Sequence, residues 1–507
     1  MSTPTILEAW NGEALDEGSV PRLPTPVFQS TVAAVVEDGG RIASLFGRPA
    51  DRGGVLVTAV LADDAAGKIG LISTEVDGSW PSLAGRCPAV QAFEREIAEQ
   101  WGVRAEGHPW FKPIRFEPPF RPVRDAFGRK DPAATIPGEY PFFAVEGEEV
   151  HEVAVGPVHA GVIEPGHFRF QCHGEEVFHL EIALGYQHRG VEQALQGGPG
   201  RRSVPLVESI AGDTVVGHTL AYAKVVESLT SAVPPARALA LRGIALELER
   251  LANHVGDLGA IANDVAFLPT ASALGARRAD YLNTLAEICG NRFGRALVVP
   301  GGTRFDLTDD AARSLAARVR RAWAGTRASA NLLFDSPSVR ARLEGTGTVA
   351  RDVAVQLGLV GPAARACGIA RDVRHDHAVG IYRFAHIPVV TSDTGDVLGR
   401  VLVRYLEAEK SVAFVTEQLE RLPDGDVRAP VGPPAPRRLV ASMVEGWRGE
   451  IVHVAVTDGD GRFARYKVKD PSFHNWMGLA MALRGEQISD FPLCNKSFNL
   501  SYCGHDL

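Results

Sequence analysis

The chain has 507 residues, of which 45% are hydrophobic and 22% are charged, and its formal net charge is -8. This length allows sizeable buried cores in two or more domains, and the negative charge gives no electrostatic reason to expect a nucleic acid partner. No stretch approaches the roughly 18 consecutive apolar residues of a membrane span, so we expect that the chain does not cross a membrane by itself.

Residues 1–116 are predicted to form a small α/β domain. β-prone runs such as Gly54 to Leu61 alternate there with one polar-faced helical stretch, Ala89 to Gln100. Residues 117–150 are rich in Pro, Arg, Asp and Gly and show no sustained periodicity, which is typical of a linker or strap.

Residues 151–507 are predicted to form a second, mainly helical domain that opens with two short strands around 156–182. Helices are expected over residues 236–262, 270–290, 309–333 and 398–421, a loop over 423–436, and a hairpin over 450–468 that turns at Asp458-Gly-Asp-Gly461. The predicted fold class is therefore α+β: a small α/β N-terminal domain, then a helical domain flanked by short antiparallel strands.

One predicted helix carries a row of charged residues. Within Ala236 to Asp264, apolar residues recur every three or four positions and form a stripe that faces the core. A second stripe aligns Glu247, Arg250, His254, Asp257 and Asp264. Spacing alone favours a solvated charged face. The alternative is an ionisable line inside a helical bundle, where neighbouring charges shift pKa values and relay protons.

The cysteines and glycines exclude two common kinds of site. No two of the six cysteines form a CxxC pair; they are Cys87, Cys172, Cys289, Cys367, Cys494 and Cys503. This distribution fits a reducing cytoplasm and indicates no self-evident metal cluster. No GxGxxG string opens a helix after a strand, so any NADH site is expected on another subunit.

A string in the first domain resembles the C subunit of respiratory complex I. The residues that carry the resemblance are Phe93-Glu-Arg-Glu96, Trp101-Gly-Val103 and Glu106-Gly-His-Pro109. The resemblance implies that this domain docks on a neighbouring subunit and has no catalysis of its own.

The second domain resembles the D subunit of complex I and the large subunit of energy-converting nickel-iron hydrogenases, including formate hydrogenlyase. Five separated blocks carry the resemblance in the same order: Gly156 to Arg169, Leu184 to Glu192, Glu249 to His254 with Asp264, Pro300 to Gly302, and Asp470 to Asn475. The fusion of a C-like domain to a D-like domain is itself found in this family.

The four cysteines that hold nickel and iron in those hydrogenases have no counterpart at the matching positions. The first pair of positions holds Ala211 and Thr214, and the second pair holds Ser501 and Gly504, with Cys503 one place away. Soft thiolate ligands suit nickel and low-spin iron. The resemblance therefore implies a chain without its own nickel-iron centre, and hydrogen turnover by that mechanism is expected to be absent.

In complex I the equivalent cavity receives a quinone head group, and the resemblance assigns residues to it. His159 matches a loop histidine and Asp264 a helix aspartate that form a charge pair there, whereas the position of the quinone-binding tyrosine holds Glu208. Two-electron reduction of a quinone also takes up two protons, so such a site needs proton donors.

Further residues carry roles implied by the resemblance, each beside a structural alternative. Glu192 matches a glutamate that passes protons, or is a carboxylate in the first turn of a helix. His188 and Arg189 are assigned near the iron–sulfur cluster of a partner; for Arg189 the alternative is a surface ion pair. His218 follows the first pair of ligand positions, and Asp213 is a new carboxylate between them, where a buried Asp needs a partner or a raised pKa.

The leading hypothesis is a subunit of a membrane-associated oxidoreductase complex with a metal-free cavity that serves proton transfer and the reduction of a quinone or another acceptor. The alternative is a scaffold subunit that only assembles its neighbours. A third hypothesis, an active hydrogenase with altered ligands, requires bound nickel. The resemblance implies no cofactor on this chain, an iron–sulfur cluster in a small partner subunit, and membrane subunits that are ion-translocating or antiporter-like. It also implies a cytoplasmic location at the inner face of the membrane.

Overall fold

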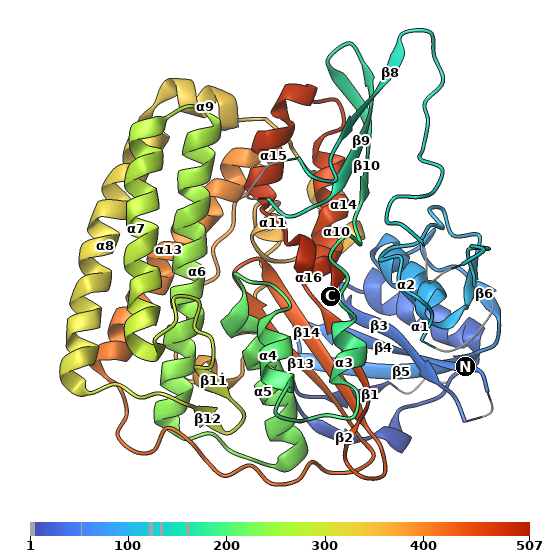
Figure 1. Cartoon of the computed structure of the whole chain (residues 1–507), viewed down its shortest axis with the longest axis horizontal. Helices are drawn as coiled ribbons and strands as arrows, with labels where there is room; N and C mark the ends of the chain where they lie inside the picture. Colours follow the sequence, from blue (N-terminus) through green and yellow to red (C-terminus); the bar gives the residue numbers. More distant parts are fainter. Residues whose placement is uncertain (1–5, 52, 121–124, 132–134, 160–162) are drawn as a thin grey trace.

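The computed structural model describes residues 6–51, 53–120, 125–131, 135–159 and 163–507. It consists of antiparallel sheets on one side and a bundle of long helices on the other (Figure 1). The α+β prediction is therefore confirmed.

The first sheet has the strand order β1-β5-β4-β3, and every pair is antiparallel. Its strands are β1 (Leu7–Ala9), β3 (Arg41–Pro49), β4 (Val55–Asp63) and β5 (Lys68–Val76). Helices α1 (Thr25–Glu37) and α2 (Gln91–Trp101) accompany it, and α2 ends at Gly102, whose φ of 69° lets it close the helix in the left-handed conformation. The predicted strand at 54–61 and helix at 89–100 are both confirmed. The short strands β6 (Ser79–Pro81) and β7 (Arg104–Glu106) pair in parallel.

The second sheet joins the two ends of the chain. Its strand order is β15-β14-β13-β2, in which β2 (Ala14–Asp16) lies beside β13 (Arg438–Gly446). Strands β14 (Gly449–Thr457) and β15 (Phe463–Lys469) confirm the predicted hairpin at 450–468, whereas β13 was not predicted. Residues of both sheets form one apolar cluster, which includes Phe46, Val60, Met443, Val452 and Val454. The first and second parts of the chain therefore share a core.

Four long helices form the bundle on the left of Figure 1. They are α6 (Ala236–Asp264), α7 (Leu268–Cys289), α8 (Asp309–Asp335) and α13 (Val397–Glu420). All four predicted helices are confirmed to within three residues at each end. Their apolar stripes interlock in the largest apolar cluster, which includes Leu248, Leu251, Leu285, Val319 and Val415.

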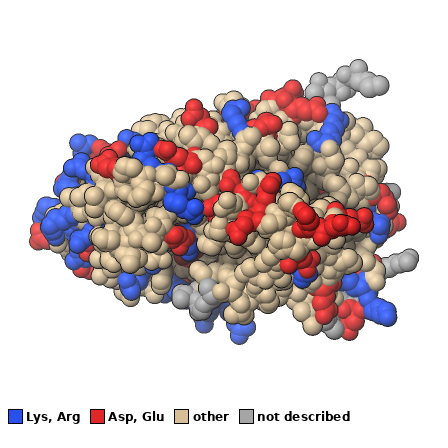
Figure 2. Space-filling view, turned by 90° about the horizontal axis from the view of Figure 1, so that it is seen from above, with Lys and Arg blue, Asp and Glu red and all other residues tan. Residues whose placement is uncertain are grey.

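A third sheet projects from the body beside the helices (Figure 1). It consists of β8 (Val150–Val155), β9 (His167–His173) and β10 (Glu176–Ala183), one strand more than predicted. This part of the chain exposes a series of carboxylates: Glu146, Glu148, Glu149, Glu152, Glu175 and Glu176. Figure 2, which views the molecule from the end where this sheet stands, shows Asp and Glu gathered over the middle and right of that face.

Shorter elements connect these layers. They are α3 (Val191–Leu195), α4 (Ser203–Glu208), α5 (Val215–Thr230), β11 (Val298–Val299), β12 (Gly302–Thr303), α9 (Pro337–Leu343), α10 (Arg351–Leu357), α11 (Gly361–Arg365), α12 (Val373–Asp376), α14 (Ser472–Ala482), α15 (Phe491–Phe498) and α16 (Tyr502–Asp506), with 3-10 turns at Glu17–Ser19, Pro88–Val90, Gly380–Arg383 and Ile488–Asp490. In the part of the chain that the structure describes, no helix is both long and apolar enough to span a membrane.

Candidate functional site

The charged row of α6 is buried. Glu247, Arg250 and His254 are fully excluded from solvent, and Asp257 is 4% exposed. The interpretation of this row as a solvated face is therefore wrong, and the alternative of an ionisable line inside the bundle is right for these four residues. The reason is enclosure: α7, α13, α15 and the β13–β14 hairpin cover α6 on several sides. Asp264, at the end of the row, is exposed.

Each buried charge of the row meets an opposite charge or a hydrogen-bond partner. The Arg250 guanidinium lies 3.1 Å from the Glu247 carboxylate, and the His254 ring nitrogen Nε2 lies 2.9 Å from Glu407. Arg365 in turn contacts Glu407 at 2.6 Å. Burial lowers the pKa of His254 to about 4, so the imidazole is neutral at neutral pH despite its acidic neighbour.

The same helix positions the segment that holds Ala211 to Thr214. The Glu249 carboxyl accepts the backbone N–H groups of Val216 at 2.7 Å and Gly217 at 3.1 Å, at the beginning of α5. The Asn253 amide donates to the Asp213 carbonyl at 2.9 Å. Burial raises the pKa of Glu249 to about 8, so this carboxyl keeps its proton at neutral pH.

A turn between β13 and β14 brings a cation to this segment. The buried Arg250 donates to the carbonyls of Glu445 and Gly446 at 2.7 and 3.0 Å and thereby fixes the beginning of the turn. Arg448, in the turn, binds both carboxylate oxygens of Asp213 at 2.6 and 2.7 Å. Although burial lowers the pKa of Arg448, the Asp213 carboxylate raises it above its usual value, so the guanidinium stays charged.

Arg448 also reaches the C-terminal segment. Its Nε donates to the Asn499 carbonyl at 2.5 Å, and the Asn499 amide is held by Asp257 of α6. Arg448 therefore bridges the two segments that, by the resemblance, would carry the metal-binding cysteines. We name this region, from Asp213 through Arg448 to the C-terminal segment, the Arg448 seam.

The four expected ligand positions lie at this seam and supply no thiolate. The Thr214 hydroxyl accepts from the Trp447 ring N–H at 3.1 Å, and the Ser501 hydroxyl accepts from the Gly504 N–H at 2.9 Å. Ala211 is fully buried. A Cβ atom at Gly504 would lie 2.7 Å from the Asp470 carboxyl group, so a cysteine there would require a shift of this neighbour.

The nearest thiol is Cys503, whose Sγ lies 3.4 Å from the Ser501 hydroxyl. Burial raises the pKa of this thiol to about 12, and the Glu164 carboxylate adds to the rise, so the sulfur is a thiol at neutral pH. The four expected ligand positions offer the hydroxyls of Thr214 and Ser501, the methyl group of Ala211 and the hydrogen of Gly504. These groups are poor ligands for nickel and low-spin iron. Among the described residues, no three His, Cys, Asp or Glu side chains are placed to hold a metal ion.

A chain of buried hydrogen bonds ends beneath Gly504. The Tyr466 hydroxyl lies 2.9 Å from His453 Nδ1, His453 Nε2 lies 3.1 Å from His218 Nδ1, and His218 Nε2 lies 3.0 Å from Asp470 Oδ2. Burial and the neighbouring His218 lower the pKa of His453 well below its usual value. Burial disfavours the charge of Asp470, but the hydrogen bond from His218 lowers its pKa nevertheless.

The hydrogen bonds of the chain are consistent with one direction of donation. If His218 donates through Nε2 to the Asp470 carboxylate, its Nδ1 accepts from His453 Nε2, and His453 Nδ1 accepts from the tyrosine hydroxyl. Every bond then has one donor and one acceptor. The arrangement links Tyr466 to Asp470 through groups that can each exchange a proton. Burial raises the pKa of Tyr466 well above its usual value, so Tyr466 keeps its own proton at neutral pH.

Other predicted residues surround the seam. The His159 ring lies against Tyr502 with Nε2 at 3.4 Å from the hydroxyl, and burial lowers the pKa of this histidine. Arg189 donates to the carbonyls of Ser209, Ile210 and Cys503, which joins the two segments at their outer side. His188 Nδ1 lies 2.8 Å from the Asp506 carbonyl. Among the described residues Arg189 makes no ion pair; its partners are carbonyl oxygens.

Three predicted residues lie apart from Arg448. Glu192 is in the first turn of α3, as the structural alternative predicts, and binds Lys467 and Arg465 at 2.9 and 2.8 Å. Burial disfavours its charge, but these cations lower its pKa below the usual range, so it stays ionised.

Glu208 and Asp264 also lie apart from Arg448. Glu208 accepts the Ala296 N–H at 2.6 Å, and Asp264 lies exposed at the end of α6. The roles that the resemblance assigned to them stay predictions.

Sequence reasoning missed Arg448, Asp470, His453 and Tyr466 as one group. Two signals were available in the sequence. Gly446-Trp-Arg-Gly449 is a tight turn with an arginine at its tip, and His453 is a single histidine in the apolar run Ile451-Val-His-Val-Ala-Val456. A polar residue inside such a run needs a buried partner.

Comparisons with known proteins show the family of the chain. The sequence profile of the "Respiratory-chain NADH dehydrogenase, 49 Kd subunit" matches residues 264–436 and 429–506, and that of the 30 Kd subunit matches residues 57–132. The carbon monoxide-induced hydrogenase of Rhodospirillum rubrum is 31% identical over 69% of this chain and 97% of its own length. Formate hydrogenlyase subunit 5 of Escherichia coli is 29% identical over 98% of this chain and 91% of its own length.

One further relative and one solved structure extend the comparison. NADH-quinone oxidoreductase subunit 4 of Thermus thermophilus is 31% identical over 68% of this chain and 90% of its own length. The solved structure of an archaeal membrane-bound sulfane sulfur reductase superposes with a TM-score of 0.66 at 24% identity, over 73% of this chain and all of the matched chain, and supports the fold. The chain therefore belongs to the family that unites the 49 kDa subunits of complex I with the large subunits of membrane-bound hydrogenases, and it carries a 30 kDa-like domain before that part.

Proposed function

We propose that the chain is the large subunit of a membrane-associated oxidoreductase complex and that the Arg448 seam transfers protons during reduction of an acceptor, with a quinone as the first candidate. In this proposal the chain binds no nickel-iron centre of its own. Electrons arrive from an iron–sulfur cluster in a small partner subunit, and ion-translocating membrane subunits complete the assembly. The chain lies on the cytoplasmic face of the membrane as a peripheral subunit.

The observation that carries the proposal is the position of the Arg448 guanidinium. It binds the Asp213 carboxylate and the Asn499 carbonyl, so a fixed cation stands between the two segments that hold metals in the hydrogenases. A buried guanidinium stabilises negative charge that develops on a nearby oxygen. Together with hydroxyls where thiolates would be needed, this supports acceptor chemistry over hydrogen chemistry.

The hydrogen-bond chain from Tyr466 to Asp470 supports the proton part of the proposal. A quinone takes up one proton for each electron, and positioned side chains accelerate such transfers about 10²–10⁴-fold. Asp470 is the last member of the chain and lies beside the backbone of Gly504. His159 and the Tyr502 hydroxyl, near the same segment, add two further groups with exchangeable protons.

The test uses the complex purified with its partner subunits. Titration with decylubiquinone, followed by paramagnetic resonance of the partner cluster, is expected to shift the cluster signal, and reduced quinone is expected to form. His218→Gln should slow quinone reduction at least tenfold, while assembly and cluster reduction stay intact. Arg313→Gln, on the exposed side of α8, is the matched control. The proposal fails if no quinone or other acceptor perturbs the cluster.

The scaffold alternative has one observation in its favour. Glu192 and Glu208 are bound to fixed cations or to backbone N–H groups, as structural residues are. Because loss of Glu192 would leave the buried Arg465 without its ion-pair partner, while Lys467 keeps Glu96, the alanine variant of Glu192 tests folding as well as function. His218→Gln separates the hypotheses better, since a scaffold would tolerate it with electron flow unchanged. The third hypothesis, an active hydrogenase, predicts stoichiometric nickel in the purified complex.

A further inference from the structure

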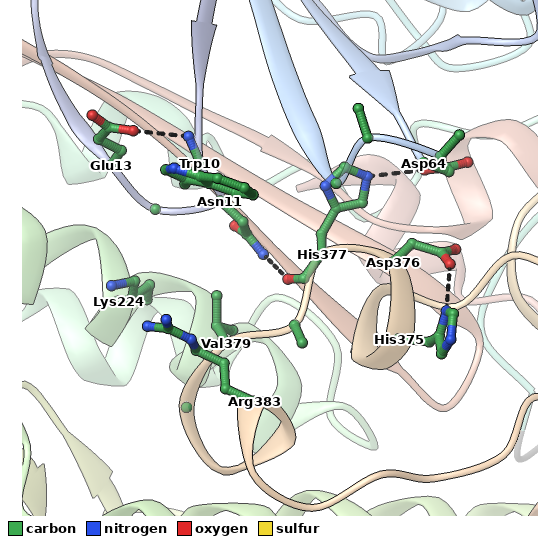
Figure 3. A pocket seen from close by; sticks show the side chains of 16 residues that line it. Trp10, Asn11, Glu13, Asp64, Lys224, His375, Asp376, His377, Val379 and Arg383 are labelled. Atoms are coloured by element: carbon green, nitrogen blue, oxygen red, sulfur yellow. Dashed lines mark hydrogen bonds and ion pairs between the residues drawn. The ribbon is translucent and has the colours of Figure 1, made fainter.

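Two cavities meet at a pair of cations, far in sequence from the Arg448 seam. The first has a volume of about 730 Å³ and lies between the loop at 10–13, the β4–β5 turn at 64–67 and the segment 375–383 (Figure 3). The second has a volume of about 300 Å³ and lies between α5, the beginning of α6 and the same segment. Both cavities are lined by Lys224, Val379, Gly380 and Arg383.

The two cations are unpaired, in contrast to the other charged side chains around them. Among the described residues, no hydrogen-bond or ion-pair partner lies at the side-chain nitrogens of Lys224 or Arg383. The other charged lining groups have partners: Glu13 with the Trp10 N–H, Asp64 with Arg41, His375 with Asp376, Glu227 with Arg242, Arg374 with Asp372, and Glu445 with Arg365.

The fold holds the two cations close to each other. Gly12, at φ 75°, has no side chain, and the methylene stem of Lys224 packs in the space where a Cβ atom would stand. Burial lowers the pKa of Lys224; the nearby Glu227 carboxylate raises it, and the Arg383 and Arg242 cations lower it. Figure 3 shows Lys224 and Arg383 on the same side of the first cavity. Arg242 binds the Glu227 carboxylate, so three cations (Lys224, Arg383 and Arg242) share one carboxylate here. A bound anion would offset the excess positive charge.

Most of the wall of the second cavity is apolar, although Glu227, Arg242, Arg374 and Glu445 also line it. The apolar part of the wall includes Leu220, Leu239, Leu246, Ile381 and Met443. Val233 and Phe384 also line it and are 79% and 80% exposed, so hydrophobic side chains reach from the cavity to the surface. A volume of this size is at the lower end of small-molecule sites and suits one short hydrocarbon chain.

We propose that this junction binds a single-chain amphiphilic anion, with its phosphate or carboxylate oxygens on Lys224 and Arg383 and its hydrocarbon chain in the second cavity. Charge complementarity selects the head group, because the two cations are the charges that lack partners. The apolar wall selects the chain, because each buried methylene contributes about 0.8 kcal/mol to transfer from water. The first cavity accommodates any polar part of the head group that extends past the cations.

Calorimetric titration of the full chain tests the proposal with three probes. Octyl phosphate, used below its critical micelle concentration, carries both features; inorganic phosphate has only the head group, and octyl glucoside has only the chain. Octyl phosphate is expected to bind in a saturable manner and at least tenfold more tightly than either of the others. Equal binding of inorganic phosphate or octyl glucoside would overturn the proposal, as would the absence of saturable octyl phosphate binding.

Variants locate the binding. The double variant Lys224→Met, Arg383→Gln should weaken octyl phosphate binding at least tenfold, whereas Lys224→Arg, which keeps the charge, should retain most of it. Leu239→Gln should weaken octyl phosphate binding severalfold and leave inorganic phosphate binding unchanged. Arg313→Gln, an exposed cation on α8, should change nothing. Unchanged octyl phosphate binding by the double variant, with a melting temperature equal to that of the parent, would exclude this junction as the site.

Discussion

Charged side chains behave differently in two regions of this molecule. Against α6, buried charges meet opposite charges; Arg365, for example, contacts both Glu407 and Glu445. At the cavity junction, Lys224 and Arg383 meet no such group among the described residues. The difference suggests a distinction that can be tested: paired buried charges stabilise the fold, whereas the partly buried Lys224 and the exposed Arg383 are available to a ligand. Four predictions test this distinction.

The largest effect is expected among the paired buried charges that lie against α6. Replacement of Arg365 by Met leaves Glu407 and Glu445 buried with fewer cations, and such a loss costs about 3–5 kcal/mol of unfolding free energy. Denaturant unfolding of both proteins measures it. Arg313→Met, which removes an exposed cation of α8, should change the unfolding free energy by less than about 0.5 kcal/mol. Similar losses for the two variants would contradict the distinction.

Glu249 is a buried acid without a cation bound to it, and its prediction concerns pH. Its pKa rises from 4.5 to about 8 in the folded chain, so the folded state holds a proton that the unfolded chain releases. The contribution of Glu249 to the unfolding free energy is therefore complete below pH 4.5, and it is lost as the pH rises toward 8. Glu249→Gln removes this loss, and at pH 9 the variant should be more stable by on the order of 3 kcal/mol.

That advantage should disappear at pH 4, where both side chains are neutral. Unfolding measured at pH 4, 7 and 9 therefore gives a difference that grows with pH. A constant difference between Glu249→Gln and the parent would show that folding does not shift the pKa of this carboxyl.

The Arg448 seam should give an intermediate effect. Arg448→Met removes a bidentate partner from Asp213, whose side chain is 34% exposed and therefore regains water. The expected loss is about 2 kcal/mol, smaller than at Arg365 for this reason. A double-mutant cycle combines Arg448→Met with Asp213→Asn. If the two side chains interact, adding either substitution to the other should lower the unfolding free energy only slightly further. Additive losses would show that the two side chains do not interact in solution.

The smallest effect is expected at the junction, and its sign is opposite. Lys224→Met removes a cation that makes no ion pair among the described residues; the Glu227 carboxylate attracts it, and Arg383 and Arg242 repel it. The unfolding free energy should stay within about 0.5 kcal/mol of the parent value or rise slightly. A loss of 2 kcal/mol or more, measured by denaturant unfolding without added ligand, would show that Lys224 stabilises the fold instead.

The charged row of α6 shows where sequence reasoning reaches its limit. The spacing of Glu247, Arg250, His254 and Asp257 correctly placed them on one stripe of a helix, because helical periodicity is a local property. Whether that stripe faces water or other side chains depends on Glu407, Arg404 and the β13–β14 turn, which lie 147 or more positions away along the chain. Their approach is a property of the whole fold.

The candidate site divides in the same way. Asp213 and His218 were identified from the sequence because they lie within a recognisable string. Arg448, His453 and Tyr466 were missed, since they come from a turn and two strands whose pattern only indicates a hairpin. His453 bonds to His218, and Arg448 bonds to Asp213; in both cases the two residues lie 235 positions apart in the chain.

The sequence by itself determined the long helices, the C-terminal hairpin, the family and the residues at the expected ligand positions, because periodicity, turn residues and ordered motifs are local signals. Only the tertiary structure decided which charges are buried and paired, and that β2 joins the sheet of β13. It alone also revealed that a hydrogen-bond chain ends beneath Gly504 and that two cations meet unpaired between cavities. These features depend on contacts between segments distant in sequence, for which the local pattern of one chain carries no signal.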